Sequence, residues 1–293
     1  MESPVTPLFT IATPSFRSSD WLKHCIASVA DQEGVTFEHI VQDAGSDDGT
    51  LDWLLSDRRV QAYVEKDSGM YDAVNRAWRR ARGEYVAYLN CDEQYLPGAL
   101  KLTADFFRAH PEVDILLGDA VVIGPSGSYK FHRKILPATL YHTWVCHLAT
   151  LTCATFVRRS FVERNDLYFD PILRDVGDAQ WMVDALRHGA KIAALGRFVA
   201  SFGDTGVNMS TKPNAIRERL DLTRSAPRWV QWLRPFWILQ HRVRRALAGV
   251  YSQEPFRYSI FTAANPDQRK VFQVDNPTFR WRLGRAPDNA TSN

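Results

Sequence analysis

The residues best placed to do chemistry are Asp92 and Glu93, which directly follow a short apolar run over residues 84–89. That run predicts a buried strand, and the helical spacing of apolar residues over 73–81 predicts a helix before it. In an open α/β sheet, ligands bind in the crevice beyond the carboxyl ends of the strands. Carboxylate oxygens at such an edge suit Mg²⁺ or Mn²⁺. The stretch therefore predicts a divalent-metal site that meets a phosphorylated ligand, with a solvated turn as the plain alternative.

The elements that must position this loop alternate between strand and helix patterns. Apolar runs predict strands, and helical spacing predicts helices between them: strands at 8–13, 37–41 and 60–64, and helices at 21–29 and 51–55. The resulting order βαβαβαβ predicts a parallel sheet with right-handed crossovers. A dinucleotide-binding fold shares this order but needs GxGxxG after its first strand. The turn here, residues 13–17, contains no glycine, which excludes a dehydrogenase of that type.

A second loop, residues 43–50, follows the second predicted strand and leads into a helix. Its glycines allow close approach of a ligand to the backbone, and a helix N-terminus attracts anions. Asp43 opens the loop, and its carboxylate could accept the ring N–H of uracil or guanine. The alternative is that Asp43 only caps the turn.

Length and composition limit the class of protein. The chain has 293 residues, enough for one large α/β domain and an appendage, and its 45% apolar and 24% charged residues are ordinary for a globular protein. A net charge of +3 does not indicate nucleic-acid binding. We find no apolar run of about 18 residues, no signal-peptide pattern and no metal or disulfide spacing of the four cysteines. These features predict a cytoplasmic protein with reduced thiols.

The order of these motifs resembles the family 2 glycosyltransferases of GT-A type. The match consists of the run Asp67-x-Gly69-x-Tyr71-Asp72-Ala73-x-Asn75, the strand end Leu89-Asn90-x-Asp92, the helix start Leu96-Pro97-Gly98, the turn Thr13-Pro14-Ser15-Phe16 and the segment 38–50. The resemblance extends over roughly residues 8–210 and implies a bacterial cell-surface polysaccharide enzyme. It also implies an α/β fold of GT-A type, with a Rossmann-like nucleotide-binding, mostly parallel central sheet and helices on both faces.

What the resemblance implies for activity is an inverting, metal-dependent transfer of a sugar from a nucleotide-diphosphate sugar to an acceptor hydroxyl. Mg²⁺ or Mn²⁺ is expected at Asp92. Asn90 stands where many members have an aspartate, which predicts a lower metal affinity. The residues expected to contact the nucleotide sugar are Thr13, Pro14, Phe16, Asp43, Lys66, Asp67, Asp72, Asn75, Asn90 and Cys91.

The segment 167–189 resembles the part of the family that carries the catalytic base. By register that base is Asp178, with Asp175 as the competitor, and Asp178 could instead only cap the following helix. The family more often has Glu or Ala where this chain has Gly177. His147 is a further candidate for the acceptor site, or else a satisfied core histidine. Residues 202–210 match a flexible loop near the diphosphate.

The resemblance ends near residue 211. We therefore predict a GT-A domain over 1–211, with a donor half over 1–119 and an acceptor half over 120–211, and an appendage of helices and short strands over 212–293. Residues 222–253 contain six arginines and three tryptophans but no Asp or Glu. Such a segment suits the headgroup layer of an anionic membrane. The alternatives are that it packs on the domain or forms a homo-oligomer interface.

The expected partners are a UDP, GDP or dTDP sugar and a saccharide or lipid-linked saccharide acceptor, with no nucleic acid. The expected location is the cytoplasm, with the inner face of the cell membrane as the alternative. Two other functions stay open: a nucleotidyltransferase and a non-catalytic nucleotide-sugar-binding subunit. The first usually has a Gly-x-Gly-x-Arg first turn, which is absent, and the intact Asp43, Asp92 and Asp178 argue against the second.

Overall fold

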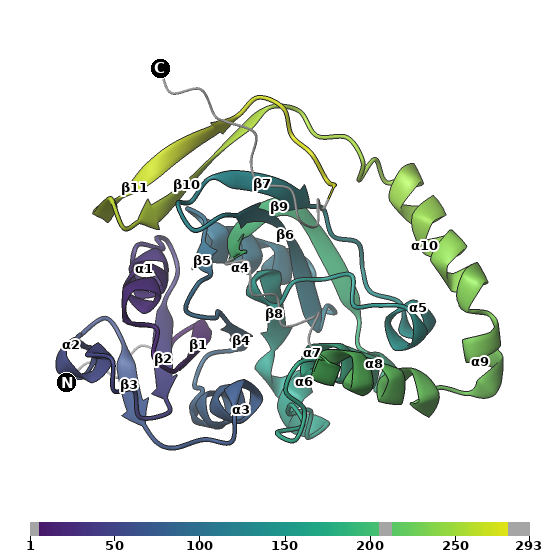
Figure 1. Cartoon of the computed structure of the whole chain (residues 1–293), viewed down its shortest axis with the longest axis horizontal. Coiled ribbons are helices and arrows are strands. Elements are labelled where there is room, and N and C mark those ends of the chain that lie inside the picture. Colours follow the sequence, from purple (N-terminus) through teal and green to yellow (C-terminus); the bar gives the residue numbers. More distant parts are fainter. Residues whose placement is uncertain (1–5, 205–212, 281–293) are drawn as a thin grey trace.

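The computed structural model describes residues 6–204 and 213–280, which form a central mixed sheet with helices on both faces (Figure 1). The strand order is β3-β2-β1-β4-β8-β6-β9-β5, and β7 pairs with β6. The strands are β1 (Phe9–Ser15), β2 (Phe37–Asp43), β3 (Gln61–Val64), β4 (Tyr85–Tyr88), β5 (Gln94–Tyr95), β6 (Ile115–Ile123), β7 (Tyr129–Arg133), β8 (Thr155–Arg158) and β9 (Ile192–Gly203). The helices are α1 (Ser19–Ala30), α2 (Thr50–Leu54), α3 (Met70–Arg80), α4 (Ala99–Ala109), α5 (Leu140–Val145), α6 (Arg159–Arg164) and α7 (Gly177–Arg187).

The donor half of the sheet is parallel, as its alternating pattern predicts. Strand β1 pairs in parallel with β2 and β4, and β2 pairs in parallel with β3. Beyond β4 the sheet becomes mixed, because β8 runs antiparallel to both β4 and β6. Strand β9, for which the sequence analysis makes no prediction, pairs in parallel with β6 and antiparallel with β5. It thereby brings a distant part of the chain to the loop that precedes β5.

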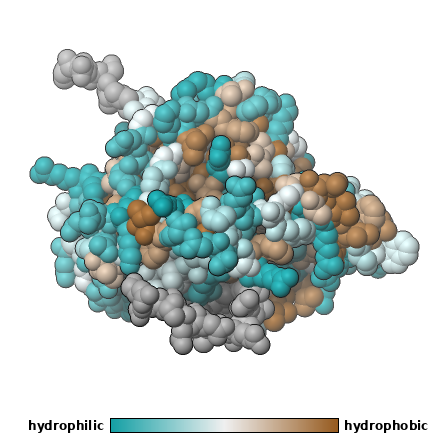
Figure 2. All heavy atoms as spheres, turned by 90° about the horizontal axis from the view of Figure 1, so that it is seen from above, coloured by the Kyte–Doolittle hydropathy of each residue, from teal (hydrophilic) through white to brown (hydrophobic). Residues whose placement is uncertain are grey.

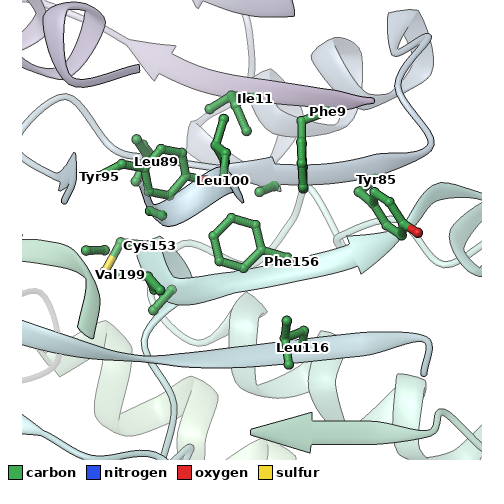
Figure 3. Packing of buried hydrophobic residues seen from close by; sticks show 14 of the residues in the cluster. Phe9, Ile11, Tyr85, Leu89, Tyr95, Leu100, Leu116, Cys153, Phe156 and Val199 are labelled. Carbon is green, nitrogen blue, oxygen red and sulfur yellow. The ribbon is translucent and has the colours of Figure 1, made fainter. Parts of the chain in front are cut away.

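Each face of the sheet has its own apolar core. On one face, helices α1 and α4 cover the sheet, and Figure 3 shows Phe156 of β8 among Leu89, Leu100 and Leu116. The Phe156 ring also stacks on Tyr95, with ring centroids 5.5 Å apart. On the other face, α3, α6 and α7 pack around a group of aromatic rings: Tyr71, Trp78, Tyr88, Phe161, Phe169 and Trp181. Burial of each such side chain contributes about 1.5–3 kcal/mol to the free energy of folding. The two apolar layers therefore fix the sheet that carries the loops of the site.

The C-terminal segment wraps around the right-hand and upper sides of the domain (Figure 1). It consists of α8 (Pro213–Ser225), α9 (Arg228–Trp232), α10 (Arg234–Leu247), β10 (Phe256–Thr262) and β11 (Asn265–Val274). Trp237 of α10 is 9% exposed and packs on Tyr141 of α5, with ring centroids 4.9 Å apart. The β10–β11 hairpin packs on β6 through Tyr258 and Ile260. The segment therefore packs on the preceding part of the chain along much of its length, while the domain boundary at residue 211 stays a prediction.

Two further expectations concern the chain as a whole. All four cysteines are free and buried, as expected for reduced thiols. Within residues 6–204 and 213–280, no helix combines the length and the apolar character that crossing a membrane requires.

The docking of α10 can be tested with two tryptophans of opposite exposure. We expect Trp237→Ala to lower the free energy of unfolding by about 3–5 kcal/mol, because it empties a buried site. Trp232, which is 82% exposed, serves as the matched control, and Trp232→Ala should cost less than about 0.5 kcal/mol. Urea unfolding followed by circular dichroism measures both. Equal effects of the two substitutions would contradict the observed docking.

Candidate active site

Asp92 lies on the loop between β4 and β5, beyond the carboxyl ends of the parallel strands. The Glu93 carboxylate accepts the Asn90 N–H at 2.7 Å, which closes the loop. Gly203 of β9 passes so close that a Cβ there would lie 2.6 Å from the Asp92 carbonyl oxygen. Because any larger residue at 203 would collide with the loop backbone, the position of Asp92 depends on this glycine. No local sequence signal marks Gly203 for this role, because the loop that it contacts lies more than one hundred residues earlier in the chain.

The half-buried Asp92 and the fully buried Glu93 form an acidic pair. Burial, and then the charge of Asp92, raises the pKa of Glu93 well above its usual range, and burial raises the pKa of Asp92. Among the residues that the structure describes, no basic side chain pairs with either carboxylate, and Glu93 Oε1 has no hydrogen-bond partner. Uncompensated carboxylate oxygens at this edge fit a bound Mg²⁺ or Mn²⁺, whose charge would stabilise the ionised pair.

Asp43 is fully buried at the end of β2, and its two carboxylate oxygens are saturated. They accept hydrogen bonds from the hydroxyls of Ser15 and Ser46, both at 2.8 Å, and from the N–H groups of Gly45 and Ser46, at 2.9 and 2.7 Å. A carboxylate has about four acceptor positions, and all are used here. The turn-capping alternative thus describes this geometry, and a nucleobase would have to displace one of these donors to reach Asp43.

Two other residues expected to contact the nucleotide, Thr13 and Cys91, have side chains that are buried and bonded within the protein. Thr13 is fully buried, and its hydroxyl forms a hydrogen bond with His39 Nε2 at 2.9 Å. Cys91 is 8% exposed, and its thiol donates to the Pro14 carbonyl at 3.3 Å. The alternation of side chains along β1 turns Thr13 into the core. Phe16, which is 52% exposed, and the half-buried Pro14 are the accessible residues of this turn.

Asn75, another residue expected to contact the nucleotide, is also bonded within the protein. Its side chain is 2% exposed, its amide donates to the Phe169 carbonyl at 2.7 Å, and its amide oxygen accepts the Phe169 N–H at 2.9 Å. A primary amide satisfies both backbone groups at once because it is a donor and an acceptor. Asn75 therefore locks α3 onto the segment before α7.

The loop before α3 contains both structural and accessible groups. Asp72 accepts the Ser68 N–H at 2.9 Å and pairs with Arg76 at 3.0 Å, so its side chain holds the start of α3. Asp67 accepts the Gly69 N–H at 2.9 Å and remains half-buried, and burial raises its pKa. Lys66 is exposed. Asp67 and Lys66 are thus the residues of this loop that a ligand can reach.

Asp178 lies in the first turn of α7, whose N-cap residue is Val176. The Asp178 N–H donates to Tyr71 Oη at 3.1 Å, and its own carboxylate accepts the Ala179 N–H at 2.8 Å. Burial raises the pKa of Asp178 to about 6, against smaller lowering effects that include the Ala179 hydrogen bond and the Arg219 charge. The side chain lines a small cavity with aromatic and threonine residues. Asp178 is therefore not the N-cap, and it has the raised pKa that suits a general base.

The turn before α7 is held by Glu218 of α8, which the sequence analysis does not identify. Its carboxylate accepts the N–H groups of Arg174 and Asp175, both at 2.9 Å, and of Val176 at 3.0 Å. The competitor Asp175 is itself bound, because its carboxylate accepts the Asn214 amide at 2.6 Å. No local signal identifies Glu218, since its partners lie about forty residues earlier in the chain.

The structure explains the departure from the family pattern at Gly177. A Cβ on Gly177 would lie 2.5 Å from the ring of Tyr71, so no larger side chain fits while Tyr71 holds Asp178. Asp178 lines its cavity together with Tyr88, the last residue of β4, and its charge makes a small contribution to the raised pKa of Glu93. His147 instead contacts His142 and His241. Of the predicted diphosphate loop over 202–210, residues 205–210 lie outside the described residues.

Residues 10–170, more than half of the chain, match the family model described as Glycosyl transferase family 2. The chain belongs to this family. The predicted glycosyltransferase is therefore confirmed at the level of the family.

Relatives of this family 2 glycosyltransferase occur in several bacteria. The chain is 36% identical to the "Putative teichuronic acid biosynthesis glycosyltransferase TuaG" of Bacillus subtilis, over 34% of this chain and 42% of that protein. It is 31% identical to the "PGL/p-HBAD biosynthesis glycosyltransferase" of Mycobacterium bovis, over 49% of this chain and 58% of that protein. The chain thus spans about half the length of these relatives.

Solved structures confirm the fold class. Staphylococcus aureus TarS 1-349 in complex with UDP-GlcNAc has a TM-score of 0.61 and 23% identity, over 73% of this chain and 65% of that chain. The mannosyltransferase PcManGT from Pyrobaculum calidifontis, in complex with GDP-Man and Mn²⁺, has a TM-score of 0.54 and 16% identity. The match covers 85% of this chain and 77% of that chain. At these identities the likeness shows the α/β GT-A fold alone.

The role of Asn75 in this transferase can be tested by stability. We expect Asn75→Ala to lower the free energy of unfolding by about 2–4 kcal/mol, because it leaves two buried backbone groups of Phe169 without partners. Asn165→Ala, which removes one half-buried hydrogen bond to Phe161, is the control and should cost about 1 kcal/mol or less. Urea unfolding gives both values. A stable Asn75→Ala variant that has lost nucleotide affinity would instead make Asn75 a ligand contact.

Proposed function

We propose that the protein is an inverting, metal-dependent glycosyltransferase that moves a sugar from a nucleotide-diphosphate sugar to a hydroxyl of a saccharide or lipid-linked saccharide. The observation that carries this proposal is that two acidic centres share one end of the sheet. One is the uncompensated pair Asp92 and Glu93, and the other is Asp178 with its raised pKa. One centre suits a cation and a diphosphate, and the other suits removal of a proton from an acceptor.

The printed names of the relatives support the kind of acceptor and the donor. TuaG is named for teichuronic acid biosynthesis, and TarS of Staphylococcus aureus is named a poly(ribitol-phosphate) beta-N-acetylglucosaminyltransferase. These names support a role in surface polysaccharide assembly. TarS was solved with UDP-GlcNAc and PcManGT with GDP-Man and Mn²⁺, which supports a nucleotide-sugar donor and a divalent metal.

The residues divide into those that contact the donor and those that shape its site. Donor contacts are assigned to the accessible or half-buried residues, namely Pro14, Phe16, Lys66, Asp67 and Asn90. Structural roles are assigned to the buried or fully bonded residues, namely Thr13, Asp43, Asp72, Asn75 and Cys91. This division follows because a side chain whose polar atoms are all bonded inside the protein has none left for a ligand.

Asp92 would hold the divalent ion, with Glu93 beside it. When bound, such an ion screens the charge that develops on the leaving diphosphate. Asp178 accepts the proton of the acceptor hydroxyl as that oxygen attacks the anomeric carbon. With a pKa of about 6, Asp178 is mostly ionised at pH 7 yet more basic than an ordinary aspartate. Tyr71 and Glu218 keep its helix in place.

The metal site is tested with Asp92→Asn. We expect this variant to lose turnover and the Mn²⁺-dependent part of the rise in melting temperature that UDP, GDP or dTDP causes, because only ligands that bind the native state raise it. Asp105→Asn, a change at an exposed carboxylate of α4, is the control and should behave as the parent. Asp92→Asn with full metal-dependent activity would place the metal on Glu93 instead. Release of pyrophosphate in place of a nucleoside diphosphate would indicate the nucleotidyltransferase alternative.

The base is tested by Asp178→Asn and by the pH dependence of the rate. The variant should keep donor binding while kcat falls about 10²–10⁴-fold. In the parent, kcat/KM should decline as the pH falls through about 6, because a protonated carboxyl group cannot accept the proton. Asp175→Asn is the control. If it removes the activity while Asp178→Asn does not, Asp175 is the base.

The proposal extends to a membrane surface at the exposed face of α9 and α10. Nine of the fifteen exposed large apolar side chains in the described part of the chain lie between residues 213 and 251, so they are concentrated on this segment. Figure 2 shows brown apolar atoms at the right-hand end, where Figure 1 places α9 and α10. On α9 and α10 the exposed apolar residues are Trp229, Trp232, Phe236, Leu239, Val243 and Leu247.

The charge of this face supports an anionic membrane as its partner. Arg228, Arg234 and Arg242 are exposed, and no acidic side chain of the described residues pairs with them. Arg224 differs from these three, because it pairs with Asp221 at 3.5 Å, although residues 222–253 contain no Asp or Glu. Each arginine at an anionic surface contributes about 1 kcal/mol, screened by salt. The apolar side chains between them would enter the headgroup layer.

Vesicle binding tests this surface. The full chain should sediment with phosphatidylglycerol vesicles at low salt and be released at high salt. The double variant Trp232→Glu and Leu247→Glu should bind much less, and both sites are over 80% exposed, so the fold should tolerate the change. Leu55→Glu, at a 66% exposed site outside the segment, is the control. A parent that ignores vesicles but dimerises through this face would establish the oligomer alternative.

A further inference from the structure

Three histidines meet where α10 packs on α5. His142 belongs to α5, His147 follows that helix, and His241 belongs to α10. Their ligand atoms all lie within 4.8 Å of one another. The ring of His142 lies 4.6 Å from that of His147 and 4.0 Å from that of His241, measured between centroids. The transferase chemistry described above uses none of these residues.

The two buried members have polar atoms without partners. His142 is 2% exposed and His241 is 8% exposed, and Nε2 of each has no hydrogen-bond partner. Leaving a buried polar atom unsatisfied costs about 1–3 kcal/mol. Two such atoms in adjacent, stacked rings leave unsatisfied polar groups that a bound ion could satisfy. The exposed His147 connects the cluster to solvent.

The protonation state of the rings favours a metal. Burial, followed by the neighbouring rings and the charges of Arg244 and Arg245, lowers the pKa of His142 to about 3. Burial and the same neighbours lower the pKa of His241 to about 4, and the pKa of His147 is also lowered. The imidazoles are therefore neutral at pH 7, which is the form that binds metal ions.

The surrounding charges limit which ion fits. No carboxylate is among the groups that shift the pKa of these histidines, and the nearby arginines oppose a cation. Two of those guanidinium groups are held elsewhere, since Arg244 donates to the Pro137 carbonyl at 3.0 Å and Arg245 stacks on Tyr251. A site with nitrogen ligands alone does not suit Mg²⁺ or Ca²⁺, which need oxygen ligands, but suits Zn²⁺, Cu²⁺ or Ni²⁺.

We propose that His142, His147 and His241 bind one transition-metal ion of the zinc class, which fastens α10 to α5. In tetrahedral zinc sites the ligand nitrogens are roughly 3.4 Å apart, so these nitrogens must approach each other by about an ångström on binding. The rings of His142 and His241 are stacked, with an angle of 19° between their planes, so at least one of them must also turn to direct its nitrogen at the ion. A water molecule or an anion would take the fourth position and offset the charge of the arginines. The ion would stabilise the docked position of the exposed α10 face.

The experiment uses the full-length chain without a histidine tag and with Asp92→Asn, so that the proposed catalytic metal site does not contribute. After chelation and dialysis, Zn²⁺ titration calorimetry should give one ion per chain, and Co²⁺ should show the strong visible absorption of a tetrahedral site. Adding His147→Ala, at an exposed position, should lower the Zn²⁺ affinity by at least about 10-fold, since even outer-shell changes cost about 10–100-fold. His147→Cys, which supplies another ligand, should restore it. His110→Ala is the control and should bind as the parent.

Two results would overturn the proposal. One is Zn²⁺ binding that is equal in the parent and in the His147→Ala variant. The other is that inorganic phosphate or pyrophosphate, and not Zn²⁺, raises the melting temperature of the metal-free parent and loses this effect with His147→Ala, which would make the cluster an anion site. Because every variant carries Asp92→Asn, neither result bears on the proposed catalytic metal.

Discussion

The placement of two adjacent carboxylates, the half-buried Asp92 and the fully buried Glu93, after the end of β4 is the constraint on which the rest of the structure depends. Burial raises the pKa of both residues, and the charge of Asp92 raises the pKa of Glu93 further. Three contacts fix the conformation of the loop that carries them. The Asn90 N–H donates to Glu93, β5 pairs with β9, and Gly203 lies against the backbone of Asp92. Such a pair lowers stability by itself, and the proposed cation would offset that cost.

The C-terminal segment is part of this constraint. Gln94, next to Glu93, pairs through its amide with both the N–H and the carbonyl of Phe261 in β10, each at 2.9 Å. Glu218 of α8 likewise holds three N–H groups before α7. The loops that carry Glu93 and Asp178 are thus both braced by residues beyond 211. The segment supports the site and, on its outer side, presents an apolar and cationic face.

The two roles of the C-terminal segment explain why one side of α10 is buried and another side is exposed to solvent. One side of the helix, with Trp237 and His241, packs on α5, and another side, with Phe236, Leu239 and Leu247, faces solvent. A helix with two apolar sides needs two partners. The first is the catalytic domain, and the proposed second is the surface where the acceptor resides. An ion held by the three histidines would stabilise the first contact so that the second face keeps its orientation.

The sequence by itself determined the order of the elements, the parallel donor half, the family and the positions of Asp92 and Asp178. These follow from signals within short windows: the period of apolar residues, the glycine-containing turns and the order of motifs along the chain. Only the tertiary structure decided which of the expected site residues are accessible. Asn75 meets Phe169 across 94 residues, Thr13 meets His39 across 26, and Glu218 meets Val176 across 42. Such contacts leave no local pattern, because a polar side chain in a motif looks the same whether it faces a ligand or satisfies a distant backbone group. The convergence of His142 and His241 arises in the same way, from the packing of two helices that are far apart in the chain.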